Sequence, residues 1–214
     1  MGSDDLFHKP KERKLESLGR RRGFRNILPR ILILCEDSKS SKYYFEEICK
    51  EYKLQKIVVI KHPDTAPCKI VECAKQHEAE YDKIFCVFDY DDKDESYKKA
   101  LNLIGKTKKI IPITSHPSFE YWLLLHHVLH EAPFHKTGNH SIGEMVEREL
   151  KKHINDYSKD AKNIFQKTKD KLEIAIQHAK QRLRACESYD ARKHLSNPST
   201  FVHELIEYLQ GLKI

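Results

Sequence analysis

Carboxylates follow two apolar segments of this chain. Glu36 comes directly after the apolar run 31–35, and Asp89 and Asp91 follow the apolar run 84–88. Two Asp residues at positions i and i+2 beyond a strand can turn toward one ion, because the side chain between them points to the opposite side. Hard cations prefer carboxylate oxygens. The sequence therefore predicts that Glu36, Asp89 and Asp91 hold Mg²⁺ or Mn²⁺ and carry the catalytic chemistry.

A plainer interpretation competes for the same acidic segment. Asp91, Asp92, Asp94 and Glu95 also suit a solvated turn followed by a helix, because negative charge stabilises a helix N-terminus. That interpretation suits the last two acids, but it explains less well why Asp89 ends an apolar run. We keep Asp92 as a second-line candidate for the site.

Glu120 and His126 are further second-line candidates near the expected strand ends. Glu120 falls in the first turn of a predicted helix, where a carboxylate is favoured without any catalytic role. His126 and His130 are four residues apart and could share zinc on one helix face, but no third ligand has a fixed spacing. Packing in a core is the alternative for this segment.

The elements that would position these groups form a strand–helix alternation. We expect strands at 28–35, 55–60, 84–88 and 109–113, and helices at 41–54, 66–79 and 95–104. This order predicts an α/β fold with a mostly parallel four-stranded sheet flanked by helices. Pro112 lacks a backbone donor and indicates that the fourth strand lies at the sheet edge.

The second half of the chain changes to a helical pattern. Helices are expected at 117–130, 141–152, 161–187 and 200–212. We therefore divide the chain into a basic arm (1–26), an α/β domain (27–130) and a helical C-terminal region packed on it (131–214).

Positive charge is concentrated near the N-terminus. The chain has a net charge of +7, and residues 1–30 hold nine Lys or Arg and four acids, a balance of +5. A basic arm beside carboxylates suits a nucleic-acid partner. The residues expected to contact phosphates are Arg20, Arg21, Arg22, Arg25, Lys39 and Lys42. A solvated leader is the alternative for residues 1–19.

Cysteine usage and hydropathy point to a cytoplasmic protein. The six Cys residues include no C-x-x-C pair, and we expect all of them to be reduced. The chain has no signal-peptide pattern and no apolar run near the roughly 20 residues that a membrane span needs.

Several motifs together resemble the RloB family, whose members are encoded in restriction-modification and phage-defence loci. The segments that carry the resemblance are Ile33-Leu34-Cys35-Glu36, Phe88-Asp89-Tyr90-Asp91-Asp92, Ser115-His116-Pro117-Ser118-Phe119-Glu120-Tyr121-Trp122-Leu123-Leu124-Leu125-His126 and Asn197-Pro198-Ser199-Thr200. The family in turn resembles Toprim domains, which hold Mg²⁺ with one Glu and an Asp-x-Asp. The resemblance implies that Glu36 matches the Toprim glutamate, and Asp89 and Asp91 the Asp-x-Asp.

The chain departs from the family pattern just after Glu36. The usual Glu-Gly-x-x-Thr-Glu has Asp37 at the Gly place, Ser40 at the Thr place and Ser41 at the second Glu place. His116 stands where the family usually has Asn. A one-metal site is compatible with these changes, whereas a two-metal site loses a carboxylate.

Two functions follow as expectations. The first is a Mg²⁺-dependent Toprim-type nuclease in phage defence, with Glu36 as general acid or base. The alternative is a non-catalytic sensor or adaptor that docks a partner ATPase, which the family's genomic setting implies. The sequence leaves open DNA or RNA, strandedness, the trigger and the oligomeric state.

Overall fold

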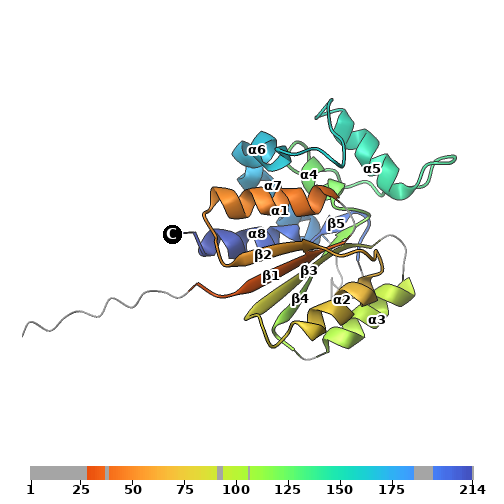
Figure 1. Ribbon diagram of the computed structural model, residues 1–214. Helices are drawn as coiled ribbons and strands as arrows, with labels where there is room; N and C mark the ends of the chain where they lie inside the picture. Colours follow the sequence, from red (N-terminus) through yellow and green to blue (C-terminus); the bar gives the residue numbers. More distant parts are fainter. Residues whose placement is uncertain (1–27, 37–38, 91–93, 106, 186–194, 214) are drawn as a thin grey trace, which may run out of the picture.

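A computed structural model describes residues 28–36, 39–90, 94–105, 107–185 and 195–213. Its centre is a five-stranded sheet in the order β2-β1-β3-β4-β5 (Figure 1). The strands are β1 (Ile31–Cys35), β2 (Ile57–Lys61), β3 (Lys83–Asp89), β4 (Ile110–His116) and β5 (Ser199–Thr200). The first four are parallel, and β5 runs antiparallel to β4. The α/β class and the mostly parallel sheet are confirmed, but the predicted count of four strands is wrong.

The additional strand β5 comes from the segment expected to open the last helix. Thr200 and Ser199 pair with Ser115 and His116, and the Phe201 amide donates to the Thr114 carbonyl at 2.8 Å. The Thr200 hydroxyl accepts from the Val202 amide, so helix α8 (Val202–Gly211) begins two residues later than expected. A strand of two residues is too short to show a period-two pattern, which is why the sequence did not indicate it.

The prediction that the strand with Pro112 lies at the sheet edge is wrong, because β5 pairs with β4 on the side away from β3. Pro112 lies opposite Cys86 of β3, whereas β5 pairs with β4 only at Ser115 and His116. Along residues 110–114, β4 has no second partner strand among the described residues, so the missing Pro112 donor leaves no gap in a strand ladder.

Alternating side chains of the strands divide the core into two clusters, one on each face of the sheet. Ile31, Ile33 and Cys35 of β1 point to the face covered by α1 (Lys39–Glu51) and α8, and Leu32 and Leu34 point to the other. Helices α2 (Pro67–Gln76) and α3 (Asp94–Ile104) cover that second face (Figure 1). Burial on both faces explains why β1 and β3 read as unbroken apolar runs.

Edge strand β2 is less covered than β1. Its burial alternates, and Val58 and Ile60 are about two-fifths exposed, at 41% and 40%. Its inward residues Ile57 and Val59 pack against the cluster on the α1 face.

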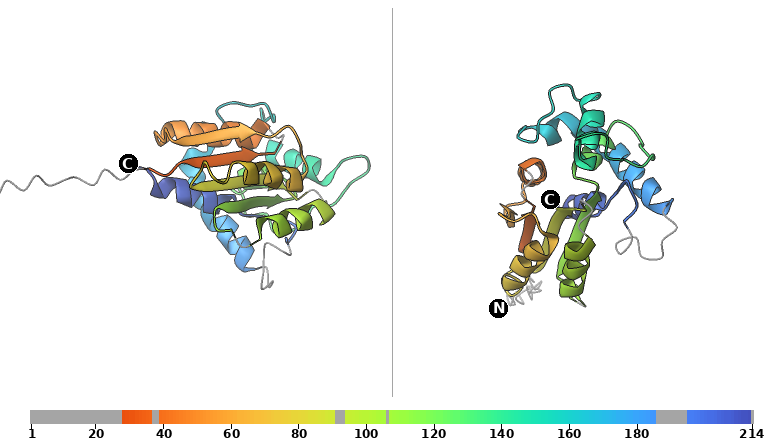
Figure 2. Two further views of the ribbon diagram at one scale, coloured as in Figure 1. Left: turned by 60° about the horizontal axis from the view of Figure 1, so that its bottom comes forward. Right: turned by 90° about the vertical axis from the view of Figure 1, so that its right-hand side faces the viewer.

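The helical region contains α4 (Glu120–Leu124), α5 (Ile142–Lys151), α6 (Ile164–Thr168), the 3-10 helix η1 (Lys169–Lys171) and α7 (Leu172–Arg184). It packs on the α1 face of the sheet, with α6 against α1 and α7 against α8 and β5 (Figure 2). The predicted helix at 141–152 is confirmed, whereas 117–130 holds only the short α4. The predicted helix at 161–187 is three elements, and Asn163 before the first of them adopts φ +72°, which no α-helix contains.

The apolar stripe of this region joins the core on the α1 face. Phe165, Leu172 and Ile176 belong to the same buried cluster as Phe45 and Ile33. The boundaries at residues 26 and 130 stay predictions. In the described part of the chain, no helix has both the length and the apolar character needed to span a membrane.

Candidate metal centre at the carboxyl edge of the sheet

The parallel strands bring their carboxyl ends to one edge of the sheet. Cys35 lies opposite both Lys61 and Val87, and Asp89 lies opposite Ser115. The Glu36 amide continues the ladder by donating to the Val87 carbonyl at 2.8 Å. Glu36 and Asp89 therefore leave adjacent strands at the same level.

A side-chain hydrogen bond joins these two residues directly. The Asp89 amide donates to Glu36 Oε2 at 2.7 Å. The Glu36 side chain is 8% exposed, and Asp89 is partly exposed. A backbone donor thus fixes the orientation of the Glu36 carboxylate beside Asp89, and charge-assisted bonds of this kind are stronger than neutral ones.

The same point is where the sheet reverses its winding. The connection from β1 to β2 uses α1 on one face, whereas the connections through α2 and α3 use the other face and lead to β3 and β4. Ligand sites of open α/β sheets form at such a reversal, outside the carboxyl ends of the strands. Glu36 of β1 and Asp89 of β3 flank it.

Tyr90 is turned away from the carboxylate pair. Its ring packs edge-on against Tyr97 of α3, with centroids 5.0 Å apart, and against His116, at 4.8 Å. Its amide donates to the Ser115 carbonyl at 2.8 Å. This is the orientation expected for the middle residue of an Asp-x-Asp pair. Asp91 and Asp92 themselves lie outside the described residues.

The residues present fit a hard divalent cation in part. Glu36 and Asp89 supply two carboxylates from adjacent strands, which is the donor type that Mg²⁺ and Mn²⁺ take, usually with several waters. Within the described ranges, no group of three His, Cys, Asp or Glu side chains could hold a metal ion. The third expected ligand, Asp91, is outside those ranges.

Glu120 lies in a buried cluster of hydroxyl groups. Its side chain is 1% exposed, and its carboxylate accepts hydrogen bonds from Ser40 (3.1 Å), Ser118 (2.7 Å) and Tyr157 (2.8 Å). Burial raises the pKa of the Tyr157 phenol, and the negative charge of neighbouring Glu120 raises it further. Sequence reasoning missed Tyr157, because a lone Tyr 37 residues after Glu120 carries no spacing signal.

His126 is placed in the core of the α1 face. Its Nδ1 donates to the Trp122 carbonyl at 3.1 Å, and its Nε2 lies 3.3 Å from the Tyr44 hydroxyl. Burial lowers the pKa of His126 to about 3, so the ring is neutral near pH 7. The neighbouring His130 stacks on Phe134, with centroids 4.4 Å apart.

The expected phosphate-contacting residues are only partly described. Arg20, Arg21, Arg22 and Arg25 lie outside the described residues. Lys39 forms an ion pair with Asp160 at 2.7 Å, and Lys42 forms one with Glu46 at 2.9 Å.

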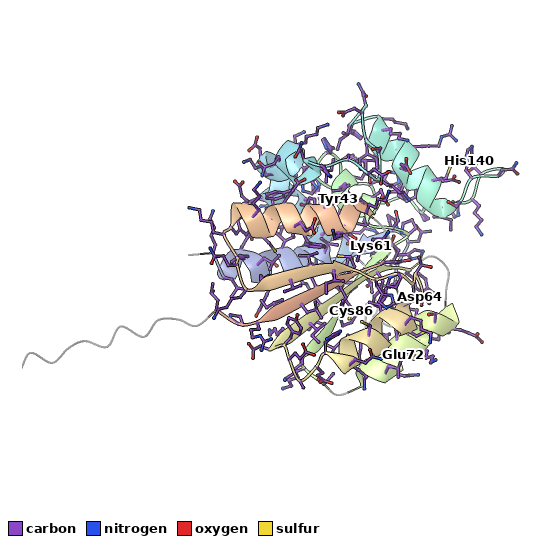
Figure 3. All side chains as sticks on the ribbon, in the orientation of Figure 1. Tyr43, Lys61, Asp64, Glu72, Cys86 and His140 are labelled. Atoms are coloured by element: carbon purple, nitrogen blue, oxygen red, sulfur yellow. The ribbon has the colours of Figure 1, made fainter. Side chains whose placement is uncertain are left out.

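Lys61 is a cation at the carboxyl edge that sequence reasoning did not select. It ends β2 opposite Cys35, and Figure 3 labels it there. A Lys directly after the predicted apolar strand 55–60 was the sequence feature that could have indicated this position.

The fold and the carboxylate pair define an α/β protein with an acidic edge at its winding reversal. The family model described as RloB-like protein matches residues 31–209, which include every strand and both carboxylates. The chain therefore belongs to the RloB-like family, as the motifs indicated. Comparison with curated proteins and with solved structures gives no match for this chain.

Proposed function

We propose that this protein is a Mg²⁺-dependent nucleic-acid phosphodiesterase of Toprim type that acts in phage defence. The observation that carries the proposal is the direct contact between Glu36 and Asp89 at the winding reversal of the sheet. The chain belongs to the RloB-like family, and its resemblance to that family implied a metal site at these residues. Family membership therefore supports the same assignment. The likeness to Toprim domains is part of the proposal.

Each carboxylate has a distinct part in this mechanism. Asp89 would hold the metal together with Asp91, which lies outside the described residues. Glu36, beside Asp89, would be a further ligand or the group that moves a proton. A bound Mg²⁺ supplies charge stabilisation for the phosphoryl oxygens. The Asp89 amide fixes Glu36 Oε2, so the carboxylate keeps its orientation when a phosphodiester binds.

The substrate would be held by positive charge outside the carboxylate pair. Arg20, Arg21, Arg22 and Arg25 of the arm, with Lys39 and Lys42, contact backbone phosphates in this proposal. Lys39 and Lys42 now pair with Asp160 and Glu46 at half-exposed positions, so exchange of these partners for phosphate requires little rearrangement.

The test is cleavage of single- and double-stranded DNA and RNA by the purified protein with Mg²⁺ or Mn²⁺. Glu36→Gln and Asp89→Asn remove one charge each without changing side-chain volume, and we expect each to lower the rate by about 100-fold or more. Glu72→Gln is the matched control, because Glu72 is an acid on α2 that pairs with Lys69 and Lys99, which are not among the proposed phosphate contacts. Equal cleavage by all four proteins would contradict the nuclease assignment.

One observation favours a second function, a non-catalytic sensor or adaptor that docks a partner ATPase. Ser41 stands where the family usually has a second Glu, and here it is 1% exposed. Burial raises the pKa of the Cys35 thiol to about 12, and a hydrogen bond with Ser41 opposes that rise. The place of the second carboxylate is thus occupied by a core contact rather than by a possible ligand.

Metal binding separates the two functions. Calorimetric titration with Mn²⁺ should show binding that Asp89→Asn abolishes if the nuclease assignment is right. Protein that binds no Mn²⁺, but co-purifies with a candidate partner ATPase when the two are co-expressed, would support the adaptor. Cleavage that appears only when the ATPase is added would support a nuclease that depends on its partner.

A further inference from the structure

Glu120 and Glu36 are the two buried acidic side chains in the described part of the chain. The proposed chemistry uses Glu36 but leaves Glu120 without a role. Burying a carboxylate is unfavourable unless hydrogen bonds replace its water. The three hydroxyl donors around Glu120 meet that requirement, so the question is what this cluster holds together.

The donors come from three separate segments. Ser40 lies in the first turn of α1, Ser118 lies between β4 and α4, and Tyr157 lies between α5 and α6. Ser40 and Tyr157 both donate to Oε1, whereas Ser118 donates to Oε2. One carboxylate therefore joins the start of α1 to the helical region and to the segment that follows β4.

The first turn of α1 is directly connected to the proposed metal centre. Ser40 is four residues after Glu36, and four residues span at most about 14 Å even when extended. The next residue, Ser41, is buried against Cys35, the residue before Glu36. Glu36 thus directly follows β1, and the Ser40–Glu120 bond holds the helix that begins three residues after Glu36.

We propose that Glu120 is a positioning residue for the metal centre and not a metal ligand. It fixes the first turn of α1 through Ser40, and so the placement of Glu36 beside Asp89. Through Tyr157 it also links that placement to the segment between α5 and α6. The proposal explains why a hydroxyl is kept at the place of Ser40, where the family pattern has Thr. It rests on the proposed metal site.

The experiment compares Ser40→Ala, Glu120→Gln and Tyr157→Phe with a matched control, Ser96→Ala. Ser96 also contributes a hydroxyl that joins two helices, through Cys68, but on the opposite face of the sheet. Two properties are measured for each full-length protein: Mn²⁺ affinity by calorimetry, and hydrogen–deuterium exchange of backbone amides in peptides covering 36–45 and 94–104.

We expect Ser40→Ala and Glu120→Gln to weaken Mn²⁺ binding by about 10-fold or more, the usual effect of losing a group that orients a metal ligand. The same variants should speed exchange in 36–45 and leave 94–104 unchanged. Tyr157→Phe should act in the same direction more weakly. Ser40→Thr keeps a hydroxyl and should retain the Mn²⁺ affinity and the exchange rate in 36–45 of the wild type. Ser96→Ala should also leave both unchanged.

Two results would overturn the positioning role. One is normal affinity and normal exchange in 36–45 for both Ser40→Ala and Glu120→Gln. The other is faster exchange throughout the protein, which would make the cluster a general contribution to stability. If the wild type itself binds no Mn²⁺, the proposed metal site fails, and exchange in 36–45 alone decides whether Glu120 anchors the segment around Glu36.

Discussion

The two faces of the sheet are covered in different ways. On the α2 and α3 face, the buried cluster consists of apolar side chains, Cys68, Cys86 and Tyr97. On the α1 face, the apolar cluster is larger and has buried polar groups beside it, among them Glu120 and His126. Both faces contribute apolar burial, but the α1 face adds directional contacts between distant segments.

Helix α1 carries several of those directional contacts. Ser40 bonds to Glu120, Tyr44 to His126, and Glu47 to backbone amides at the start of α6. Hydrogen bonds specify geometry more strictly than apolar contact does, because an unmet buried donor or acceptor is costly. The comparison indicates that the α1 face sets precise positions near Glu36 and Asp89, whereas the α2 and α3 face mainly supplies burial.

The largest expected effects are the losses of unfolding free energy when a buried apolar side chain is removed from either face of the sheet. Phe45→Ala on α1 should lower the unfolding free energy by about 3–5 kcal/mol, and Ile70→Ala on α2 by about 2–5 kcal/mol, because both side chains are fully buried. Urea unfolding at pH 7 measures both. A loss on only one face would contradict the view that both faces form the core.

Acid should destabilise the α1 face through His126. Its folded pKa of about 3 lies below the ordinary value of 6.5, so the unfolded chain binds the proton first and stability falls as pH drops from about 6.5 toward 3. Between pH 7 and 4.5, the wild type should lose on the order of 2–3 kcal/mol more than His126→Gln. Urea unfolding at the two pH values gives this difference.

The matched control for acid sensitivity is His77→Gln, which changes a histidine paired with Glu80 on the α2 side and 39% exposed. It should keep the full acid sensitivity of the wild type. If His126→Gln and the wild type respond alike to acid, burial of a neutral imidazole does not account for the pH dependence.

A smaller effect is expected where α1 meets α6. Glu47 accepts hydrogen bonds from the amides of Asn163, Phe165 (3.0 Å) and Gln166 (3.3 Å), and so acts as an N-terminal cap supplied by another helix. Glu47→Ala should cost about 1–2 kcal/mol in urea unfolding. Glu46→Ala, one residue earlier, loses only its partly exposed pair with Lys42 and should cost much less. Equal losses would rule out capping as the reason.

The smallest effect is expected on the surface of α2 and α3. Glu72 pairs with Lys69 at 2.9 Å and with Lys99 at 3.4 Å, and these lysines are half-exposed. Such pairs are screened by water and salt. Glu72→Gln should leave the thermal midpoint within measurement error in 0.5 M NaCl, with at most a slight decrease at low salt. A clear decrease in high salt would show that this face also depends on directional contacts.

Local patterns were sufficient for the centre of the fold. The apolar runs that became β1 and β3 are buried on both faces, so their sequence shows no gaps. Each run ends at an acidic residue, and both ends lie at one edge of the sheet because the strands are parallel. Gly105, at φ +58°, follows α3 where the helix was expected to stop. Each of these strands and helix ends is indicated by residues close in sequence, and the approach of Glu36 to Asp89 follows from the parallel order of the strands.

Features that depend on distant partners were not predictable in this way. The strand β5 exists because Thr200 meets Ser115, and the Glu120 cluster needs Tyr157, which no local pattern connects to it. The early end of α4 and the division of 161–187 likewise follow from tertiary packing, which overrides helix propensity. Asp91 and the arginines of the arm stay predictions.

The pairing of β4 with β5 has a consequence for the order of folding. Ser115 and Thr200 are 85 residues apart, and β5 supplies the partner for the Thr114 carbonyl through Phe201. Contacts between distant residues form slowly, because the intervening chain must be ordered first. During synthesis the strand beside Ser115 and Asp89 can be added only after residues 199–201 have left the ribosome, long after β1 and β3 have been made.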